Sequence, residues 1–304
     1  MDSAVRAGAI WIHERLSPMT KLIAALAILA ALAWAVTAAA SWIAKKKAPL
    51  ALAAGKGSSH ATAAEQDKSM LRAQWRTVAA IVFAAIMFAA LFRISIGLSG
   101  QAGLPIAMTT GLSASGGLLL FSALPAAQLT NANPAAKTPL LPRRAFILPA
   151  ATLAIFTAFV IATELAPDFT AVKTDGVPLL LVAVAFAGSA LLVLHRLATT
   201  AMLADPRMAA LDLRWREISA RNVLNFASGA LLAGLGTAAI LAALALNAVP
   251  AGAAAAPSPH WATACAGGGV AVALAGVVLL ALAAKGALTI RTRAREGALA
   301  PVTA

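Results

Sequence analysis

The stretch FAALFRISIGLSGQAGLP, from Phe88 to Pro105, ends one long apolar run and begins the next. The first run extends from Thr77 to Leu98, and the second extends from Leu104 to Leu129. A helix of about 20 apolar residues crosses the roughly 30 Å of a bilayer core, so each run is long enough to span a membrane. The fold can therefore be predicted from such runs and from the charges between them.

Seven runs of this kind occur along the 304 residues. The chain is 61% hydrophobic and 12% charged, with a mean hydropathy of +0.85, whereas about a quarter of the residues of a soluble domain are charged. We therefore predict an all-α, polytopic integral membrane helix bundle with seven transmembrane helices. The third run has a polar first half, so a re-entrant segment remains an alternative there. The runs are Leu22–Ala44, Thr77–Leu98, Leu104–Leu129, Ala145–Leu165, Val177–Leu194, Leu224–Val249 and Trp261–Ala284.

Nineteen of the 24 Lys and Arg residues fall on one side of this predicted topology. By the positive-inside rule that side is cytoplasmic, which puts the N-terminus outside and the C-terminus inside a plasma membrane. Six of the 11 acidic residues fall on the inner side and five on the outer side. The five basic and five acidic residues of the outer side cancel, so the net charge of +13 belongs wholly to the inner side. A topology signal therefore accounts for the basic excess without any nucleic-acid partner.

The segments outside the spans have distinct compositions. We predict an outer amphipathic segment at 1–21, a basic flexible cytoplasmic loop at 45–76 and a cytoplasmic amphipathic helix at 195–223. The second to fifth spans then occupy 77–194, the sixth and seventh occupy 224–284, and 285–304 form a basic cytoplasmic tail. The basic loop is either a solvated topology anchor or a segment attracted to anionic lipids.

Two of these segments leave alternatives open. The helix at 195–223 carries an apolar stripe that includes Trp215, so it either rests on the inner membrane surface or extends the sixth span as a stalk. The first run could instead be a signal peptide cleaved within Thr37–Ser41, but cleavage there would export the basic loop and contradict the charges of every later loop.

Ionisable residues within the runs lie near helix ends. Arg93 and Glu164 come out at the same outer interface when each residue is counted as a 1.5 Å rise, and we predict that they form an ion pair; snorkelling to head groups is the alternative. No run carries a charge at its centre, which weighs against proton-coupled transport. A seven-span protein with a lysine in its last span could bind retinal through that lysine. Lys285 lies at the end of its run rather than at the centre, so we reject this function.

The sequence GLSG, from Gly97 to Gly100, resembles the GxSG pattern of rhomboid-type intramembrane serine proteases. The resemblance implies Ser99 as nucleophile and a histidine partner from another helix, and His260 lies on the same predicted side. His260 lacks the glycine-spaced helical context of that family, which makes an enzyme the third of three readings. The four histidines have no metal-ligand spacing and lie too shallow to hold a haem, so no metal or cofactor is expected.

The other two interpretations, a transporter and a non-transporting subunit, predict different packing of the helices. The first interpretation is permease-like transport of a small or apolar solute, and a non-transporting subunit or scaffold is the alternative. Transport would need a water-accessible cavity, for which the candidate residues are Thr109, Thr110, Ser113, Ser115, Thr157 and Ser228. A non-transporting subunit or scaffold would instead show solid packing and an exposed face of small residues, which bind other helices closely in lipid. Such four-spaced faces occur on the sixth span (Gly229/Ala233 and Ala230/Gly234) and on the seventh (Thr263, Gly267, Ala271 and Ala275).

Overall fold

Helices make up nearly all of the part of the chain that the computed structural model describes, namely residues 63–98, 103–124, 127–128, 140–165, 176–201, 203, 208–248 and 259–299. All of these except Ala123 and Leu124 belong to one compact unit, which contains Gly55–Ser122 and Ala126–Ala304.

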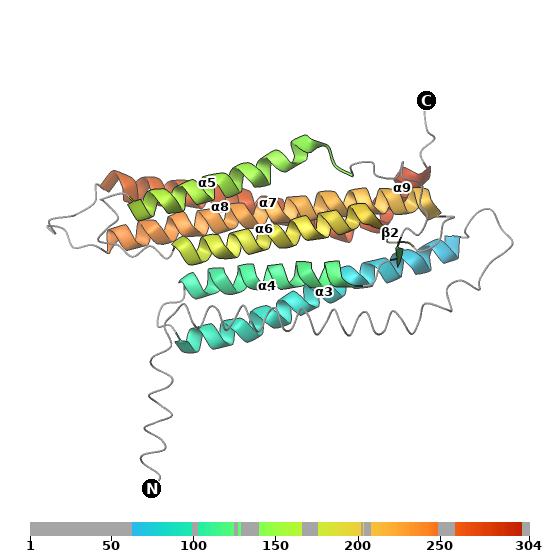
Figure 1. The fold of residues 1–304 in the computed structure, drawn as a ribbon, viewed down its shortest axis with the longest axis horizontal. Helices are drawn as coiled ribbons and strands as arrows, with labels where there is room; N and C mark the ends of the chain where they lie inside the picture. The colour runs from blue at the N-terminus through green and yellow to red at the C-terminus, as the bar shows by residue number, and fades with distance from the viewer. Residues whose placement is uncertain are drawn as a thin grey trace, which may run out of the picture. The chain divides into compact units, whose positions relative to one another are not determined.

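The unit contains seven α-helices among its described residues (Figure 1). A 3-10 turn, η3, precedes α5, and a short antiparallel bridge joins β1 to β2, with Ala127 opposite Ala201. The predicted helical class is thus confirmed. The bounds are α3 (Ala63–Leu98), α4 (Gly103–Ala123), β1 (Ala127–Gln128), η3 (Arg143–Phe146), α5 (Ile147–Leu165), α6 (Gly176–Thr199), β2 (Thr200–Ala201), α7 (Ala209–Asn247), α8 (Pro259–Leu288) and α9 (Ile290–Leu299).

Proline residues mark where several of these helices begin. Pro105, Pro178 and Pro149 are each the third residue of their helix, in α4, α6 and α5 respectively. The first amides of a helix have no acceptor within it, so a proline in the first turn removes no helical hydrogen bond. Pro149 therefore lies where it breaks no hydrogen bond of α5.

Five helical segments are long and apolar enough to cross a membrane: 64–93, 143–165, 176–199, 209–247 and 260–288. They correspond to the second, fourth, fifth, sixth and seventh predicted spans. The predicted first span, Leu22–Ala44, lies outside the described residues. The third predicted span is α4, one unbroken helix of 21 residues, about 31 Å long at 1.5 Å per residue.

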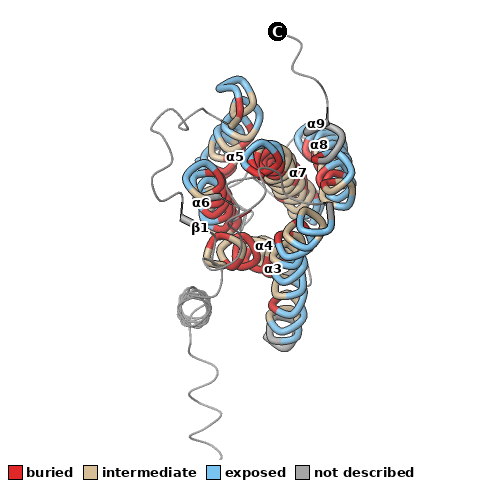
Figure 2. Tube along the Cα trace, turned by 90° about the vertical axis from the view of Figure 1, so that its right-hand side faces the viewer, coloured by how far each residue is buried: buried red, intermediate tan, exposed pale blue. Residues whose placement is uncertain are grey.

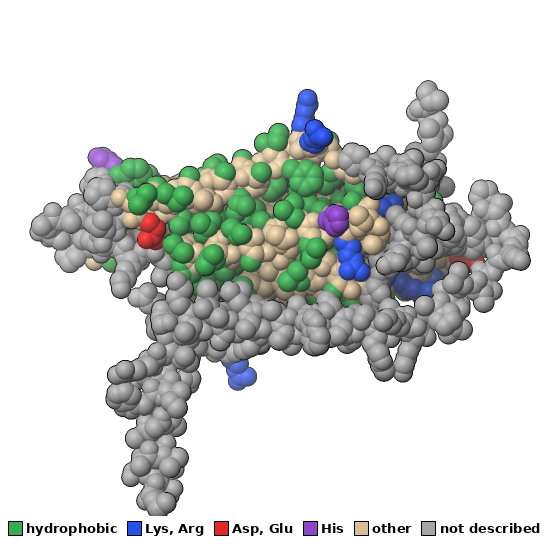
Figure 3. Space-filling view, viewed as in Figure 1, with side chains coloured by type: hydrophobic (Ala, Val, Ile, Leu, Met, Phe, Trp, Pro, Cys, Tyr) green, Lys and Arg blue, Asp and Glu red, His purple; other side chains and the backbone are tan. Residues whose placement is uncertain are grey.

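Burial divides these helices into inward and outward faces (Figure 2). Buried residues gather on the sides of α4, α6 and α7 that face one another, whereas α3, α5 and α8 present long exposed sides. Large hydrophobic side chains such as Ile155, Leu181 and Val184 are exposed on α5 and α6, and hydrophobic atoms cover much of this face in Figure 3. An apolar outer surface of this kind is what lipid contact requires.

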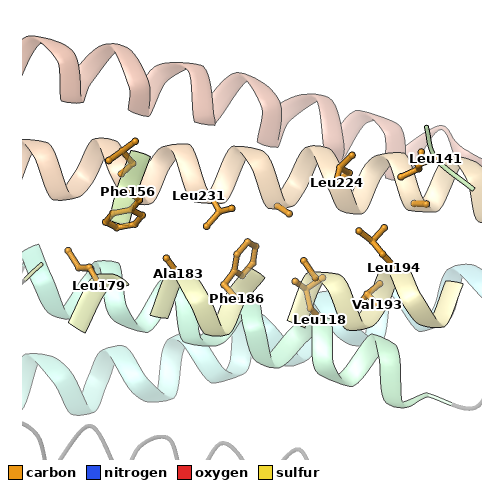
Figure 4. Packing of buried hydrophobic residues seen from close by; sticks show 14 of the residues in the cluster. Leu118, Leu141, Phe156, Leu179, Ala183, Phe186, Val193, Leu194, Leu224 and Leu231 are labelled. Atoms are coloured by element: carbon orange, nitrogen blue, oxygen red, sulfur yellow. The ribbon is translucent and has the colours of Figure 1, made fainter. Parts of the chain in front are cut away.

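The main core lies between α5, α6 and α7 (Figure 4). Phe156 of α5, 1% exposed, Phe186 of α6 and Leu231 of α7 all belong to it. The ring of Phe186 meets that of Phe226 edge-on, with centroids 5.7 Å apart. Leu118 brings α4 into the same core. The core is therefore filled by side chains from four helices.

The backbones of α7 and α8 approach each other closely along a seam. A β-carbon added at Gly236 would lie 2.6 Å from the carbonyl oxygen of Gly269, and one added at Gly276 would lie 2.6 Å from that of Gly229. These glycines let the two backbones touch, as small residues do between membrane helices. The predicted Gly229/Ala233 face of the sixth span is used here, because Ala233 also meets Gly276. The predicted small face of the seventh span is not the one that meets α7.

A second, smaller core lies at the N-terminal ends of α3 and α7, where α9 joins them; we call it the stalk cluster. The Oγ of Ser69 donates a hydrogen bond to the Sδ of Met208 at 3.3 Å beside it, and Arg291 approaches Asp67 at 3.3 Å. Its buried residues are Met70, Ala73, Leu203, Met208, Leu211, Trp215, Ile290 and Ala294.

The stalk cluster explains two differences from the sequence prediction. Residues 63–76 are helical rather than part of a flexible loop, because Met70 and Ala73 pack against the other members of the cluster. The amphipathic helix before the sixth span is continuous with it in α7, which is 39 residues and about 58 Å long. Of the two predicted alternatives, a helix resting on the membrane surface or a stalk that extends the sixth span, the structure shows the stalk. Its Trp215, 3% exposed, is covered by the protein itself.

Candidate functional site

The six residues of the predicted polar cavity have different environments. Three of the hydroxyls donate to the carbonyl oxygen four residues earlier in their own helix: Ser115 to Gly111, Thr157 to Leu153 and Ser228 to Leu224, at 2.8–2.9 Å. Such bonds satisfy the hydroxyls without any solute. Thr109, Ser113, Ser115 and Ser228 are buried, Thr157 is partly buried, and Thr110 is exposed.

Ser113 differs from these three, because its Oγ is buried and has no hydrogen-bond partner among the described residues. A buried hydroxyl without a partner costs about 1–3 kcal/mol. Its helix is held tightly nearby, since a β-carbon at Gly111 would collide with a methyl group of Val182 on α6. Close packing of α4 on α6 therefore surrounds this part of the predicted cavity.

The Ser99–His260 catalytic pair and the Arg93–Glu164 ion pair both remain predictions. Ser99 lies outside the described residues, and His260 is exposed in the first turn of α8. Arg93, near the C-terminal end of α3, and Glu164, near that of α5, are both exposed. Exposure at a helix end fits both pairing and snorkelling of these long side chains.

The small face of the seventh span lies on the exposed side of α8. Thr263, Gly267, Ala271 and Ala275 are all exposed, and a β-carbon added at Gly267 would meet no atom of the described residues within 4 Å. Residues two apart on a helix point about 200° apart, so Gly267 and the seam residue Gly269 lie on opposite sides of α8. One side of α8 thus packs on α7, and the other presents small residues outward.

The two ends of this outward side of α8 differ in the size of their side chains. Towards the C-terminal end of α8, the exposed residues include Val277, Val278 and Leu282, which are the bulky aliphatic residues that lipid contact favours. Towards the N-terminal end, Gly267 and Gly268 have no described atom within 4 Å of an added β-carbon, although Val270 and Leu274 are exposed beside them. The exposed backbone of α8 is therefore found at Gly267 and Gly268, between bulkier exposed side chains.

The sequence prediction missed one buried charged pair. Asp212 and Arg216 were counted among the cytoplasmic charges, but their side chains are 5% and 8% exposed and form an ion pair at 2.9 Å. Asp212 also accepts a hydrogen bond from the amide of Leu203 at 2.8 Å, and Arg216 donates one to the carbonyl of Leu197 at 3.4 Å. The pair thereby ties α7 to the end of α6. Its only sequence signal is the i, i+4 spacing beside Leu211 and Trp215.

The described residues contain no group of three or more His, Cys, Asp or Glu side chains that is arranged to hold a metal ion. Cys265, the single cysteine of the chain, is buried in α8. The comparisons with protein families, with curated proteins and with solved structures find no match. Any functional conclusion therefore rests on the membrane-type helices and the surfaces described above.

Proposed function

We propose that this chain is a non-enzymatic, membrane-embedded subunit that binds a transmembrane helix of a partner protein through the outward small face of α8. Exposure of Gly267, with no described atom over it, is the observation that carries the proposal. Apolar side chains gain little by leaving lipid, so close backbone contact at small residues drives helix association in a membrane. A partner helix would bring its backbone against Gly267 and Ala271.

The alternative is permease-like transport, and it has less support. A transport path needs polar groups that can exchange partners with a solute or water. Ser115, Thr157 and Ser228 instead use their hydroxyls within their own helices. The tight contact of Gly111 with Val182 also favours solid packing between α4 and α6.

We further propose that the chain has seven spans, α4 included. Met70 of α3 and Trp215 of α7 share the stalk cluster, which supports having the N-terminal ends of both helices on one side of the membrane. The chain must cross an even number of times to return to that side. With α3, α5 and α6 crossing, α4 has to cross as well. The bridge between β1, after α4, and β2, after α6, supports the same count.

The basic residues support the orientation. Lys68, Arg214 and Arg291 lie near the stalk cluster, on the side that the positive-inside rule makes cytoplasmic. The proposal therefore has the N-terminus outside, the C-terminus inside and a plasma-membrane location. The first of the seven spans in this proposal is Leu22–Ala44.

The test is photo-crosslinking in native membranes. A small diazirine amino acid at Ala271 should yield a protein adduct of one defined mass, whereas the same residue at Val184 on the exposed side of α6 should react with lipid alone. A mass twice that of the chain would identify a second copy as partner. Adding Gly267→Leu should abolish the adduct, because the leucine would cover the exposed backbone at that position. Lipid adducts alone from position 271 would refute the proposal.

A further inference from the structure

A polar pocket of about 640 Å³ lies where α7, α8 and α9 meet. Its α7 wall runs from Arg214 to Asn225, and the end of α8 and the first half of α9 complete it. The volume is in the range of small-molecule and head-group sites, about 300–1,000 Å³. It differs from the small face of α8 in position and in chemistry.

Four cationic side chains line this pocket: Arg214 and Arg221 from α7, Lys285 from α8 and Arg293 from α9. Glu217 is the carboxylate among the lining residues, and it pairs with both Arg214 and Arg221 at 2.8 Å. The side chains of Lys285 and Arg293 form no ion pair with any described residue. The lining thus carries three more positive charges than negative ones.

The fold holds these cations together despite their repulsion. Arg214 and Arg221 are seven residues apart, which places them on one face of α7 with Glu217 between them. Gly286 lets α8 approach α7 closely, since a β-carbon there would collide with the side-chain amide of Asn222. Lys285, the residue before Gly286, therefore lies where α8 approaches the side chain of Asn222.

The surroundings of the pocket place it where lipid head groups lie. Leu282 lines it from the apolar part of α8, and Asn225 lies one residue inside the predicted sixth span. Ile218 adds an apolar contact from α7. A ligand there would thus meet guanidinium, ammonium and amide groups together with the aliphatic side chains of Ile218 and Leu282. Basic pockets between membrane helices on the cytoplasmic side suit anionic head groups.

We propose that this pocket binds the phosphate group of a ligand with net negative charge, with Lys285 and Arg293 as the two cations free to contact it and Arg214 and Arg221 as its fixed electrostatic wall. Guanidinium groups donate paired hydrogen bonds to phosphate oxygens, and ammonium groups add a point charge. The phosphate can come from an anionic phospholipid or from a soluble phosphate compound, since both present the same oxygens. This inference does not depend on the proposed partner helix.

The experiment uses the full chain purified in a neutral detergent. Its probes are dihexanoyl phosphatidylglycerol, dihexanoyl phosphatidylcholine and inorganic phosphate, and its readouts are the Kd and the rise in Tm. The phosphatidylglycerol should bind and raise the Tm, and Lys285→Gln with Arg293→Gln should weaken its binding about tenfold or more. Both side chains are exposed, so the variant should keep the Tm of the unliganded protein.

The matched control is Arg143→Gln with Arg144→Gln, which removes the same charge from the exposed turn η3 and should leave binding unchanged. An equal effect of inorganic phosphate that also requires Lys285 and Arg293 would support a phosphate site with a soluble ligand. The proposal is overturned if no probe binds, if phosphatidylcholine binds equally well, or if the control variant loses as much affinity as the pocket variant.

Discussion

Asp212 and Arg216 form a buried ion pair at 2.9 Å, one turn apart on the stalk of α7. The pair is not confined to its own helix, because Asp212 accepts the amide of Leu203 and Arg216 donates to the carbonyl of Leu197. Both of those residues belong to the chain before α7. The two charged side chains therefore hold the N-terminal part of α7 against the end of α6 and the segment that follows it.

Removing one member of this pair should be costly. Asp212→Ala leaves the buried Arg216 without its counter-charge and the Leu203 amide without its acceptor, so we expect a loss of about 3–5 kcal/mol in the free energy of unfolding. Urea unfolding in detergent would measure it. The control is Arg214→Ala, which breaks an exposed pair with Glu217 and should cost about 1 kcal/mol or less.

The coupling itself can be measured with a double-mutant cycle. Asp212→Leu and Arg216→Leu together should cost less than the sum of the two single changes, because the double variant leaves no buried charge behind. Additive losses would mean that the two side chains contribute independently, contrary to the geometry.

Trp215 provides a second prediction, which concerns the stalk cluster. Its side chain is 3% exposed among Met70, Leu211 and Ile290, so Trp215→Ala should lower the free energy of unfolding by about 3–5 kcal/mol. Trp75→Ala is the control, because Trp75 is 62% exposed on α3 and its loss leaves no cavity. Equal losses for the two tryptophans would show that the cluster adds nothing to stability.

The sequence predicted the apolar helices well, and for a physical reason. Runs such as 176–199 must satisfy every backbone group within lipid, so composition and length alone determine that they are helical. The residues at 63–76 were missed because a polar segment becomes helical through tertiary contacts, here those of Met70 and Ala73 with α7 and α9. The sequence does not reveal such contacts.

The candidate surfaces were predicted in part. The small face at Gly267 was visible from its four-residue spacing, but which side of α8 would meet α7 was not, because Gly269 and Gly276 form an equally good small face. The basic pocket was missed altogether. Arg214, Lys285 and Arg293 come from three helices, and along the chain they look like ordinary positive-inside residues.

The topology leads to a third prediction, in which single cysteines are labelled in intact cells. In a Cys265→Ala background, Glu164→Cys should react with a membrane-impermeant maleimide, whereas Lys68→Cys and Arg293→Cys should react after permeabilisation alone. All three positions are exposed, so the reagent can reach each of them from its own side. Labelling of positions 68 and 293 from opposite sides would contradict an even number of crossings between the start of α3 and α9.

The last prediction separates the two faces of α8. Gly236→Val places side-chain atoms against the backbone of Gly269 and Ala273, so it should disrupt the α7–α8 seam and lower the free energy of unfolding by about 1–3 kcal/mol. Gly267→Val meets no described atom and should leave the stability of the purified chain unchanged while it weakens partner capture in the membrane. Unfolding in detergent and crosslinking from position 271 measure the two effects. If Gly267→Val destabilised the isolated chain as much as Gly236→Val does, the outward face of α8 would be an internal contact, and no partner helix would be needed to explain its small residues.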